Sequence, residues 1–433
     1  MLAHGATAGD RGLTAKRSFG YASVTMIAPS SGRLRGEDLS HPDTFVRTVP
    51  HETFRRLRAE APVFWHPDSF HGGGFWAVTR HADVLRISLD QKTFSSERGS
   101  ALNPPFPEEK LIPQREIMLN MDPPRHTKHR RLVNMGFSPK ILNKAEQHIR
   151  ELARTIVDGV ARRGRCDFVT DVAAELPLQV IVEMLGVPLA DRHKFFEWSN
   201  TMIGANDPEY ATCPEVGEVA MMQLFAYANE LAVERKRCPR EDLTSLLLQA
   251  EVDGERLTES QYDAFVMLLA VAGNETTRNL MSGGMLALIQ HPQQRARLLA
   301  DRSLLPTAVE EMLRFVSPIM CFRRTAQRDL ELRGQTIREG DRVIMWYASA
   351  NRDEEVFADA DRFDVGRQPN DHLGFGIGPH FCLGAHLARL EIRLMFEELL
   401  RRLPDIELDG PVSRLRSDFV NGIKHMPVRF TPE

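Results

Sequence analysis

A long apolar segment in the middle of the chain constrains the fold more than any other feature of the sequence. Thr258 and Gln261 have the spacing of a capping box, which predicts that a helix begins there. The helical pattern continues to His291, and Pro292 ends it. At ~1.5 Å per residue this helix is roughly 50 Å long. Because residues 264–273 are apolar on nearly all sides, we expect the helix to lie at the centre of the molecule.

The flanking sequence predicts further helices and a few short strands. Apolar residues recur every three or four positions over residues 142–160, which is typical of an amphipathic helix. Strands are predicted at 63–66 and 75–79, joined by a glycine-rich turn at 71–74. Three more are predicted at 330–332, 335–337 and 342–346. Residues 98–118 contain four prolines and predict a long functional loop.

These patterns indicate a mainly α fold with small β-sheets. Residues 1–40 are rich in Gly, Ala, Ser and Arg and show no apolar period, so they are predicted to be a flexible leader. No linker divides the remainder, and we expect residues 41–433 to form a single domain.

Composition excludes several classes of protein. The 433 residues carry a net charge of -4, which gives no indication of nucleic acid as a partner. The five cysteines are scattered and odd in number, which argues against a disulfide framework and for a reducing compartment. No apolar run approaches the ~20 residues of a membrane span. The N-terminus lacks a signal-peptide pattern, so a soluble, cytoplasmic protein is expected.

A glycine-rich segment at residues 375–384 places a cysteine directly before a predicted helix. Gly376 and Gly378 let the backbone turn tightly and approach a flat ligand closely. Backbone N–H groups at the helix start favour the thiolate of Cys382, and a thiolate is a strong iron ligand. A lone cysteine is more often a small buried residue, and a dinucleotide-binding loop is a second alternative. The latter fails because no strand precedes the segment and Cys382 stands where the last glycine belongs.

Polar residues interrupt the most apolar stretch of the predicted central helix. Gly273 and the pair Thr276 and Thr277 weaken a helix there, and a groove at this point would admit O2 and water. Such residues can also be simply capped or solvated, which is the ordinary alternative. A second motif, Glu311 with Arg314, puts both side chains on one helix face, where a surface ion pair is the ordinary alternative.

The pattern Phe-x-x-Gly-x-His-x-Cys-x-Gly over residues 375–384 resembles the haem-binding loop of the cytochromes P450. The resemblance extends over roughly residues 50–430. Segments 273–279 and 421–424 look like a bacterial, class I group that oxidises methyl-branched lipids, fatty acids, terpenoids and steroids. It implies the P450 fold, a triangular helical prism in which haem b lies between the long central helix and the helix after Cys382.

The resemblance also assigns roles to residues. Cys382 becomes the iron ligand, and Glu275 and Thr276 become the acid–alcohol pair that delivers protons and holds oxygen and water. It buries Glu311 and Arg314 with an arginine from a downstream loop, Arg367, in support of the haem loop. The remaining expected haem contacts are His126, Arg130, Ala272, Gly273, Arg324, Phe375, His380 and Gly384.

The implied activity is an O2-dependent monooxygenase that hydroxylates a lipid, fatty acid, terpenoid or steroid. Its electrons would come from NAD(P)H through a ferredoxin reductase and a ferredoxin, steered to a basic face at Lys128, Arg131 and Lys140. A monomer is expected. Two alternatives remain: a peroxide-driven peroxygenase, which typically has Arg-Pro in place of Glu275 and Thr276, and a non-catalytic haem- or lipid-binding protein.

The expected substrate is elongated and apolar, because no ionisable residue occurs among the expected contacts. These contacts are Leu268, Val271, Ala272, Pro318, Ile319, Met320, Phe419 and Val420. The segment 98–118 would close over them as a lid, with Leu102, Phe106, Leu111 and Ile112.

Overall fold

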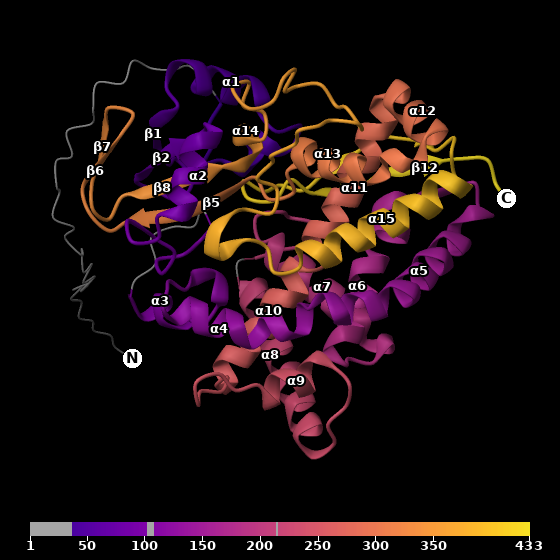
Figure 1. Ribbon diagram of the computed structural model, residues 1–433, viewed down its shortest axis with the longest axis horizontal. Helices are drawn as coiled ribbons and strands as arrows, with labels where there is room; N and C mark the ends of the chain where they lie inside the picture. The colour runs from indigo at the N-terminus through magenta and orange to yellow at the C-terminus, as the bar shows by residue number, and fades with distance from the viewer. Residues whose placement is uncertain (1–36, 102–107, 214) are drawn as a thin grey trace, which may run out of the picture. The chain divides into compact units, whose positions relative to one another are not determined.

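The computed structural model describes residues 37–101, 108–213 and 215–433 (Figure 1). Most of the predicted leader therefore lies outside the described residues, and so do two of the expected lid residues, Leu102 and Phe106. Leu39 is fully buried, and its N–H donates to Nε2 of His66 at 3.1 Å. The packed part of the chain thus begins before residue 41.

The fold is mainly helical, as the sequence predicts. None of the helices in the described part of the chain has both the length and the apolar character that a bilayer span requires. The helices are α1 (His51–Glu60), α2 (His81–Leu89), α3 (Glu108–Gln114), α4 (Arg125–Asn134), α5 (Pro139–Ala161), α6 (Glu175–Leu185), α7 (Arg192–Ile203), α8 (Glu215–Arg237), α9 (Leu243–Gln249), α10 (Glu259–Ala272), α11 (Glu275–Gln290), α12 (Pro292–Ala300), α13 (Leu305–Val316), α14 (Tyr347–Ala350) and α15 (Ala385–Arg402).

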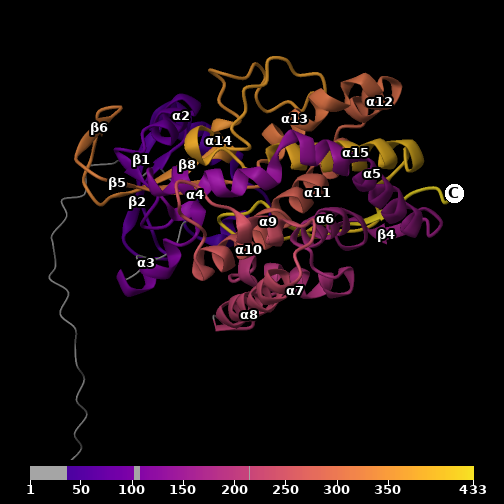
Figure 2. The same cartoon turned by 60° about the horizontal axis from the view of Figure 1, so that its bottom comes forward.

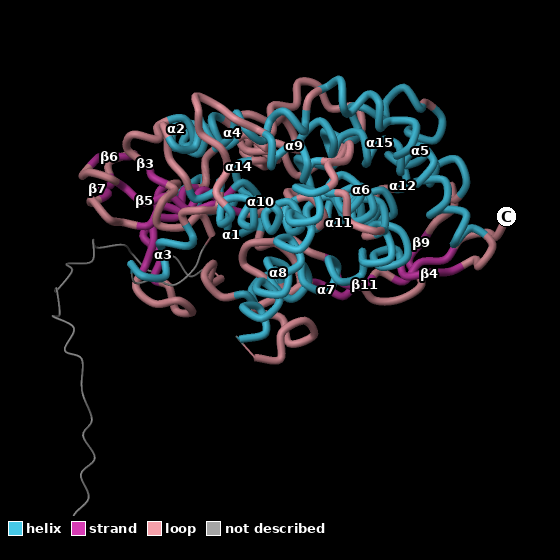
Figure 3. The backbone as a smooth tube through the Cα atoms, turned by 90° about the horizontal axis from the view of Figure 1, so that it is seen from below, coloured by secondary structure: helices cyan, strands magenta, loops and turns pink. Residues whose placement is uncertain are grey.

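The strands of the described residues form four small sheets, and Figure 3 shows strands at separate places among the helices. The largest has the order β1-β2-β8-β5-β3, in which β2 and β8 run parallel and the other neighbours antiparallel. The strands are β1 (Val63–Pro67), β2 (Gly74–Val78), β3 (Phe94–Ser95), β4 (Arg165–Asp167), β5 (Cys321–Ala326), β6 (Leu330–Leu332), β7 (Gln335–Ile337), β8 (Arg342–Trp346), β9 (Glu407–Leu408), β10 (Ser413–Arg414), β11 (Ile423–His425) and β12 (Pro427–Arg429).

The predicted central helix begins where expected but is not continuous. Thr258 caps α10 in a capping box with Gln261, and the helix ends at Ala272. A turn at Gly273 precedes α11, so the prediction of one unbroken helix was wrong. The Thr276 hydroxyl donates at 2.7 Å to the Ala272 carbonyl, the acceptor that an unbroken helix gives to the Thr276 N–H. The break therefore falls at the residues that the sequence marked as weak.

Close packing explains why glycine stands at the break. A Cβ on Gly273 would lie only 2.6 Å from Cδ1 of Ile181, so α6 approaches too closely for any side chain at this position. Further along, α11 packs against α13 and α15, and α15 packs against α5 (Figures 1 and 2). These helices hold the main apolar core, which surrounds the broken central helix.

The segment 98–118 differs from the predicted loop, because its second half folds into α3. Leu111 points into the protein and is buried, whereas Ile112 is 60% exposed. One side of a short amphipathic helix, and not a coil, therefore covers the protein here.

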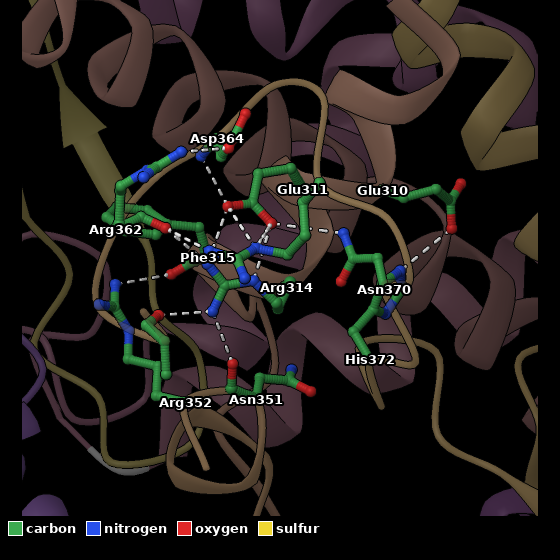
Figure 4. A network of polar contacts seen from close by, with 12 residues as sticks. Glu310, Glu311, Arg314, Phe315, Asn351, Arg352, Arg362, Asp364, Asn370 and His372 are labelled. Atoms are coloured by element: carbon green, nitrogen blue, oxygen red, sulfur yellow. Dashed lines mark hydrogen bonds and ion pairs between the residues drawn. The ribbon is translucent and has the colours of Figure 1, made fainter. Parts of the chain in front are cut away.

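A buried ion pair ties α13 to the loop that leads toward Cys382 (Figure 4). The Arg314 guanidinium donates to both oxygens of Glu311, from Nε at 2.7 Å and from Nη2 at 2.8 Å. It also donates to the carbonyls of Asn351, Ala360 and Arg362. Both charged groups are fully buried, so these contacts replace all of their water.

Glu311 also receives donors from the loop itself. Nε of Arg367 lies 3.1 Å from Oε2 of Glu311, and the Asp364 N–H donates to Oε1 at 2.8 Å. The neighbouring Glu310 pairs with His372 and with Arg389 on α15, at 3.0 Å and 2.7 Å. The structure thus brings Glu311, Arg314 and Arg367 together and links them to both ends of the cysteine segment.

Removal of one partner from this buried pair is predicted to destabilise the protein strongly. Arg314→Leu leaves the Glu311 carboxylate buried without its main counter-ion, at a cost of roughly 3–5 kcal/mol. The expected result is a clear fall in the urea midpoint of unfolding, followed by far-ultraviolet circular dichroism. Arg55→Leu, which breaks an exposed i,i+3 pair with Glu52, is the matched control and leaves the midpoint almost unchanged. Equal midpoints for the two variants would contradict the proposed role of the network.

Candidate haem and oxygen site

The cysteine segment forms a tight loop immediately before α15. Its glycines adopt positive φ angles, +66° at Gly376 and +75° at Gly378, which a residue with a side chain rarely adopts. A Cβ on Gly378 would also lie 2.9 Å from the carbonyl oxygen of Ser88 on α2. The Cys382 N–H donates to the Phe375 carbonyl at 2.9 Å, which closes the loop. The turns of the loop backbone therefore determine the position of Cys382.

The environment of the Cys382 thiol differs from the predicted one. Burial raises the pKa of this thiol, and the Gly384 N–H, Arg130 and Arg389 oppose that effect only in part. The Gly384 N–H at the helix start thus favours the thiolate, as the sequence predicts, but burial outweighs this effect. A bound metal cation would supply the missing stabilisation, because a coordinating thiol loses its proton.

A cavity of about 280 Å³ lies beside this loop. Its wall comes mainly from α10, α11, the cysteine segment and the C-terminal turn, and is mostly apolar. The structure places nearly all of the predicted site residues on this one wall: His126, Arg130, Leu268, Val271, Ala272, Gly273, Glu275, Thr276, Pro318, Ile319, Arg324, Phe375, His380, Cys382, Gly384, Phe419 and Val420.

One edge of the cavity concentrates hydrogen-bond donors. The rings of His126 and His380 lie 4.2 Å apart, and neither ring nitrogen of His126 has a partner in the described part of the chain. Burial and the charge of Arg130 lower the pKa of His126 to about 4. Burial, Arg324 and His126 lower that of His380 to about 2. These donors and cations would be satisfied by anionic groups placed between them.

The acid–alcohol pair lies at the helix break. Thr276 lines the cavity and Glu275 is buried behind it, where it forms an ion pair with Arg278. Arg278 in turn donates to Asn200 of α7 at 2.6 Å, and the Ser199 hydroxyl lies 3.4 Å from Glu275. Burial raises the pKa of Glu275 despite the neighbouring guanidinium. The Glu275 side chain is therefore restrained by Arg278 and, through Asn200 and Ser199, by α7.

Comparison with known proteins identifies the family of this arrangement. The model of the family described as Cytochrome P450 matches residues 50–404. The chain belongs to the cytochrome P450 family. It is 43% identical over 421 residues to a steroid C26-monooxygenase of Rhodococcus jostii (strain RHA1). The aligned region covers 95% of this chain and 88% of the relative. This P450 is accordingly a monooxygenase.

A second relative and a solved structure also support membership of the cytochrome P450 family. The chain is 44% identical over 388 residues to a methyl-branched lipid omega-hydroxylase of Mycobacterium tuberculosis (strain ATCC 25618 / H37Rv), covering 87% of this P450 and 90% of the relative. A cytochrome P450 of Mycobacterium marinum, solved in complex with pseudoionone, superposes with a TM-score of 0.82 at 44% identity. The match covers 88% of this chain and 94% of that one.

The residues of the cavity fit the haem that P450 proteins carry. The two propionates of haem b are anions that this edge would bind: His126 has no partner for its ring nitrogens in the described residues, and Arg130, Arg324 and His380 also line the cavity here. Cys382 is the cysteine that lines the cavity and would offer its thiolate sulfur to the iron. Beyond this chemistry the fit needs only a flat apolar space, which the glycine turn and the apolar wall provide.

One predicted substrate contact is wrong. Met320 is fully buried and does not line the cavity; its N–H donates to the Phe419 carbonyl, and its own carbonyl accepts from Ala348. In an extended segment consecutive side chains point to opposite sides, so Ile319 faces the cavity and Met320 the core.

Several wall residues were not among the predicted contacts, although Thr277, Leu387 and Ala388 lie within or next to the motifs. They are Met118, Leu119, Phe137, Ile181, Ile203, Phe265, Leu269, Thr277, Leu280, Leu313, Phe322, Tyr347, Leu387, Ala388 and Glu391. Periodicity alone could have indicated Phe265, Leu269 and Leu280, which share a helix face with predicted contacts. The others are brought to the cavity by tertiary packing.

Replacement of the cysteine is predicted to remove the thiolate signature. Cys382→Ala takes away the sulfur donor that the loop presents, so the reduced carbon monoxide complex should lose its thiolate-type absorption, or stable haem should be lost. Cys321→Ala is the control, since Cys321 is fully buried and lies outside the cavity wall. A thiolate-type spectrum in Cys382→Ala would show that another cysteine binds the iron.

Proposed function

We propose that this P450 uses O2 to hydroxylate a long apolar substrate, a steroid or a methyl-branched lipid, near the end of its chain. The apolar cavity wall carries the proposal, because Leu268, Val271, Ile319, Phe419 and Val420 offer no polar group to orient a compact polar molecule. Two relatives bear names that specify steroid C26 and the omega position, and both positions are chain ends.

Small residues at the helix break support attack at a chain end. Ala272 and Gly273 line the cavity where α10 ends, and neither has a side chain beyond Cβ. A terminal methyl group can therefore approach this point, whereas bulky ring systems would be held further away by Phe419 and Leu268. Apolar burial, at ~25 cal/mol per Å², then provides most of the binding free energy.

Haem bound at Cys382 supplies O2 binding and activation, for which two electrons and two protons must be delivered. The apolar wall excludes bulk water from the reacting carbon. The Thr276 hydroxyl, at the helix break, can exchange its hydrogen bond to the Ala272 carbonyl for one to a water molecule. The Glu275 carboxylate, once its ion pair with Arg278 is relaxed, can take up a proton from water and pass it toward Thr276.

Electrons are proposed to come from NAD(P)H through a ferredoxin reductase and a ferredoxin. Arg130 contacts the Pro379 carbonyl at 3.4 Å, so α4 lies beside the cysteine segment, and this supports its outer face as the proposed docking surface. Arg131 is exposed on that helix, whereas Lys128 is paired with Glu255 at 2.7 Å. The side chain of Lys140 lies outside the described residues, so Arg131 carries most of the proposed attraction.

A peroxygenase is the second candidate, and the helix break argues against it. Peroxide already contains the electrons and protons that the reaction needs, so a peroxygenase does not need an acid–alcohol pair to deliver protons from solvent. The retention of Glu275 and Thr276 at the cavity therefore favours O2 as the oxidant.

A binding screen is the direct test of the substrate class. Steroids and methyl-branched fatty acids are predicted to shift the haem from low spin to high spin, because an apolar ligand excludes water from the iron. Compact polar compounds should leave the spectrum unchanged. A panel in which only the polar compounds produce the shift would refute the proposed substrate.

Loss of the alcohol is predicted to uncouple the reaction. In Thr276→Ala the yield of product per NAD(P)H should fall by at least about tenfold, with peroxide released instead, because proton delivery at the break is lost. Ser282→Ala is the matched control: its hydroxyl also donates to a carbonyl four residues earlier on α11, but it lies outside the cavity wall. Unchanged coupling in Thr276→Ala would exclude Thr276 from the mechanism.

A further inference from the structure

The ion pair of Glu310 and Arg389 lies beside the cysteine segment and has no part in the mechanism above. Glu310 is on α13 and Arg389 is in the second turn of α15. The Arg389 guanidinium donates to both carboxylate oxygens of Glu310, from Nε at 2.7 Å and from Nη2 at 2.8 Å. Two parallel bonds of this kind fix both the position and the plane of the guanidinium.

The fixed guanidinium lies over the ring of Phe375. Its central carbon is 4.5 Å from the ring centroid, within the ~6 Å at which a cation and an aromatic ring attract each other. Phe375 lines the cavity, and its carbonyl accepts the Cys382 N–H at 2.9 Å. The cation of Arg389 therefore contacts the residue to which the cysteine is hydrogen-bonded.

His372 gives Glu310 a further donor (Figure 4). Nδ1 of His372 accepts the Gly374 N–H at 3.0 Å, so its proton is on Nε2, which lies 3.0 Å from the Glu310 carboxylate. Burial disfavours ionisation of Glu310, but the bonds from Arg389 and His372 outweigh it and lower its pKa to about 2. Because a guanidinium does not lose its proton in proteins, both members of the pair are charged at neutral pH.

An ion pair between two helices can be purely structural, but the position of this one indicates more. The side chains of Arg389 and Glu310 are 33% and 31% exposed, and pairs as exposed as this contribute little to stability. The charge of Arg389 does reach the cysteine. Against burial, which raises the pKa of the Cys382 thiol, the charges of Arg130 and Arg389 favour the thiolate. The pair thus acts electrostatically on the sulfur that the loop presents.

We propose that Glu310 and Arg389 set the reduction potential of the haem iron bound by Cys382, with Arg389 raising it and Glu310 lowering it. The proposal rests on haem bound at Cys382 and on the external electron donor proposed above. One added electron makes the iron and its thiolate more negative, so a nearby cation favours the reduced form and a nearby anion the oxidised form. Arg389 is not a wall residue of the cavity in the described part of the chain, so it is a positioning residue that acts through its field.

A redox titration of the haem-loaded protein without substrate, followed by its absorption spectrum, tests the proposal. Arg389→Gln leaves the Glu310 carboxylate uncompensated and should lower the equilibrium constant for one-electron reduction by about tenfold, or ~59 mV. Glu310→Gln leaves the guanidinium uncompensated and should raise that constant to a similar extent. Arg389→Lys keeps the charge but not the planar fork, and should restore most of the wild-type potential.

Arg393→Gln is the matched control, because Arg393 is on the same helix and forms an equally exposed pair with Glu397. It should leave the potential unchanged. A purely structural pair predicts shifts in the same direction for Arg389→Gln and Glu310→Gln, since both changes break the same contact. That result, or shifts no larger than that of Arg393→Gln, would overturn the proposal.

The test remains decisive if one variant is lost. If Arg389→Gln does not retain haem, a potential that fails to rise in Glu310→Gln still overturns the proposal. A wild-type protein without the thiolate-type carbon monoxide spectrum would refute Cys382 as the iron ligand, and this proposal with it. A substrate screen in which no steroid or branched lipid binds would refute only the proposed substrate, because the potentials are measured without substrate.

Discussion

The buried pair of Glu311 and Arg314 is the interaction on which the rest of the site depends. Two charges without water are stable only if every donor and acceptor finds a partner. Here the partners are backbone groups of the loop after α14, together with Arg367. That loop has little secondary structure of its own, so the charged pair replaces the hydrogen bonding that a helix or sheet would provide. It continues into the segment that presents Cys382.

The second constraint is the interruption of the central helix. A continuous helix would bury all of its backbone groups and leave no polar feature in an apolar wall. Gly273 allows α6 to approach, and Thr276 takes the Ala272 carbonyl that the backbone would otherwise use. The same residues that weaken the helix therefore supply the hydroxyl that the chemistry needs. Stability lost at the break is offset by packing of α11 against α13 and α15.

Local sequence signals predicted the parts of the fold whose cause is local. The capping box at Thr258, the hairpin after Val63 and the glycines of the cysteine segment each depend on residues a few positions apart. The sequence marked Gly273 as a weak point, but it did not predict an end of the helix there because the backbone angles stay helical, with φ -79° and ψ -34°, and the apolar period continues through it. The spacing in the sequence predicted that Glu311 and Arg314 lie on one helix face. Arg367 is 56 residues from Glu311, so only the family resemblance could predict its contact with that residue.

The residues of the cavity wall also show that local sequence signals do not predict contacts made by tertiary packing. Ile181 and Ile203 are ordinary apolar residues of amphipathic helices, and only the packing of α6 and α7 against the central helix brings them to the cavity. Met320 fails for the opposite reason, since it lies next to a true wall residue in sequence but faces the other side of an extended segment. Sequence position indicates which segment reaches a site, whereas side-chain direction requires the strand or helix to be placed.

Glu275 and Glu391 show how one cavity wall can contain two buried carboxyl groups in different electrostatic surroundings. Burial raises the pKa of both, but only Glu275 has a guanidinium beside it, and that cation is anchored to α7 through Asn200. Proton release from Glu275 is therefore tied to the position of α7, whose last residue, Ile203, lines the cavity and can respond to substrate. Glu391 has no such restraint. The restraint on Glu275 suits a proton transfer that must wait for substrate.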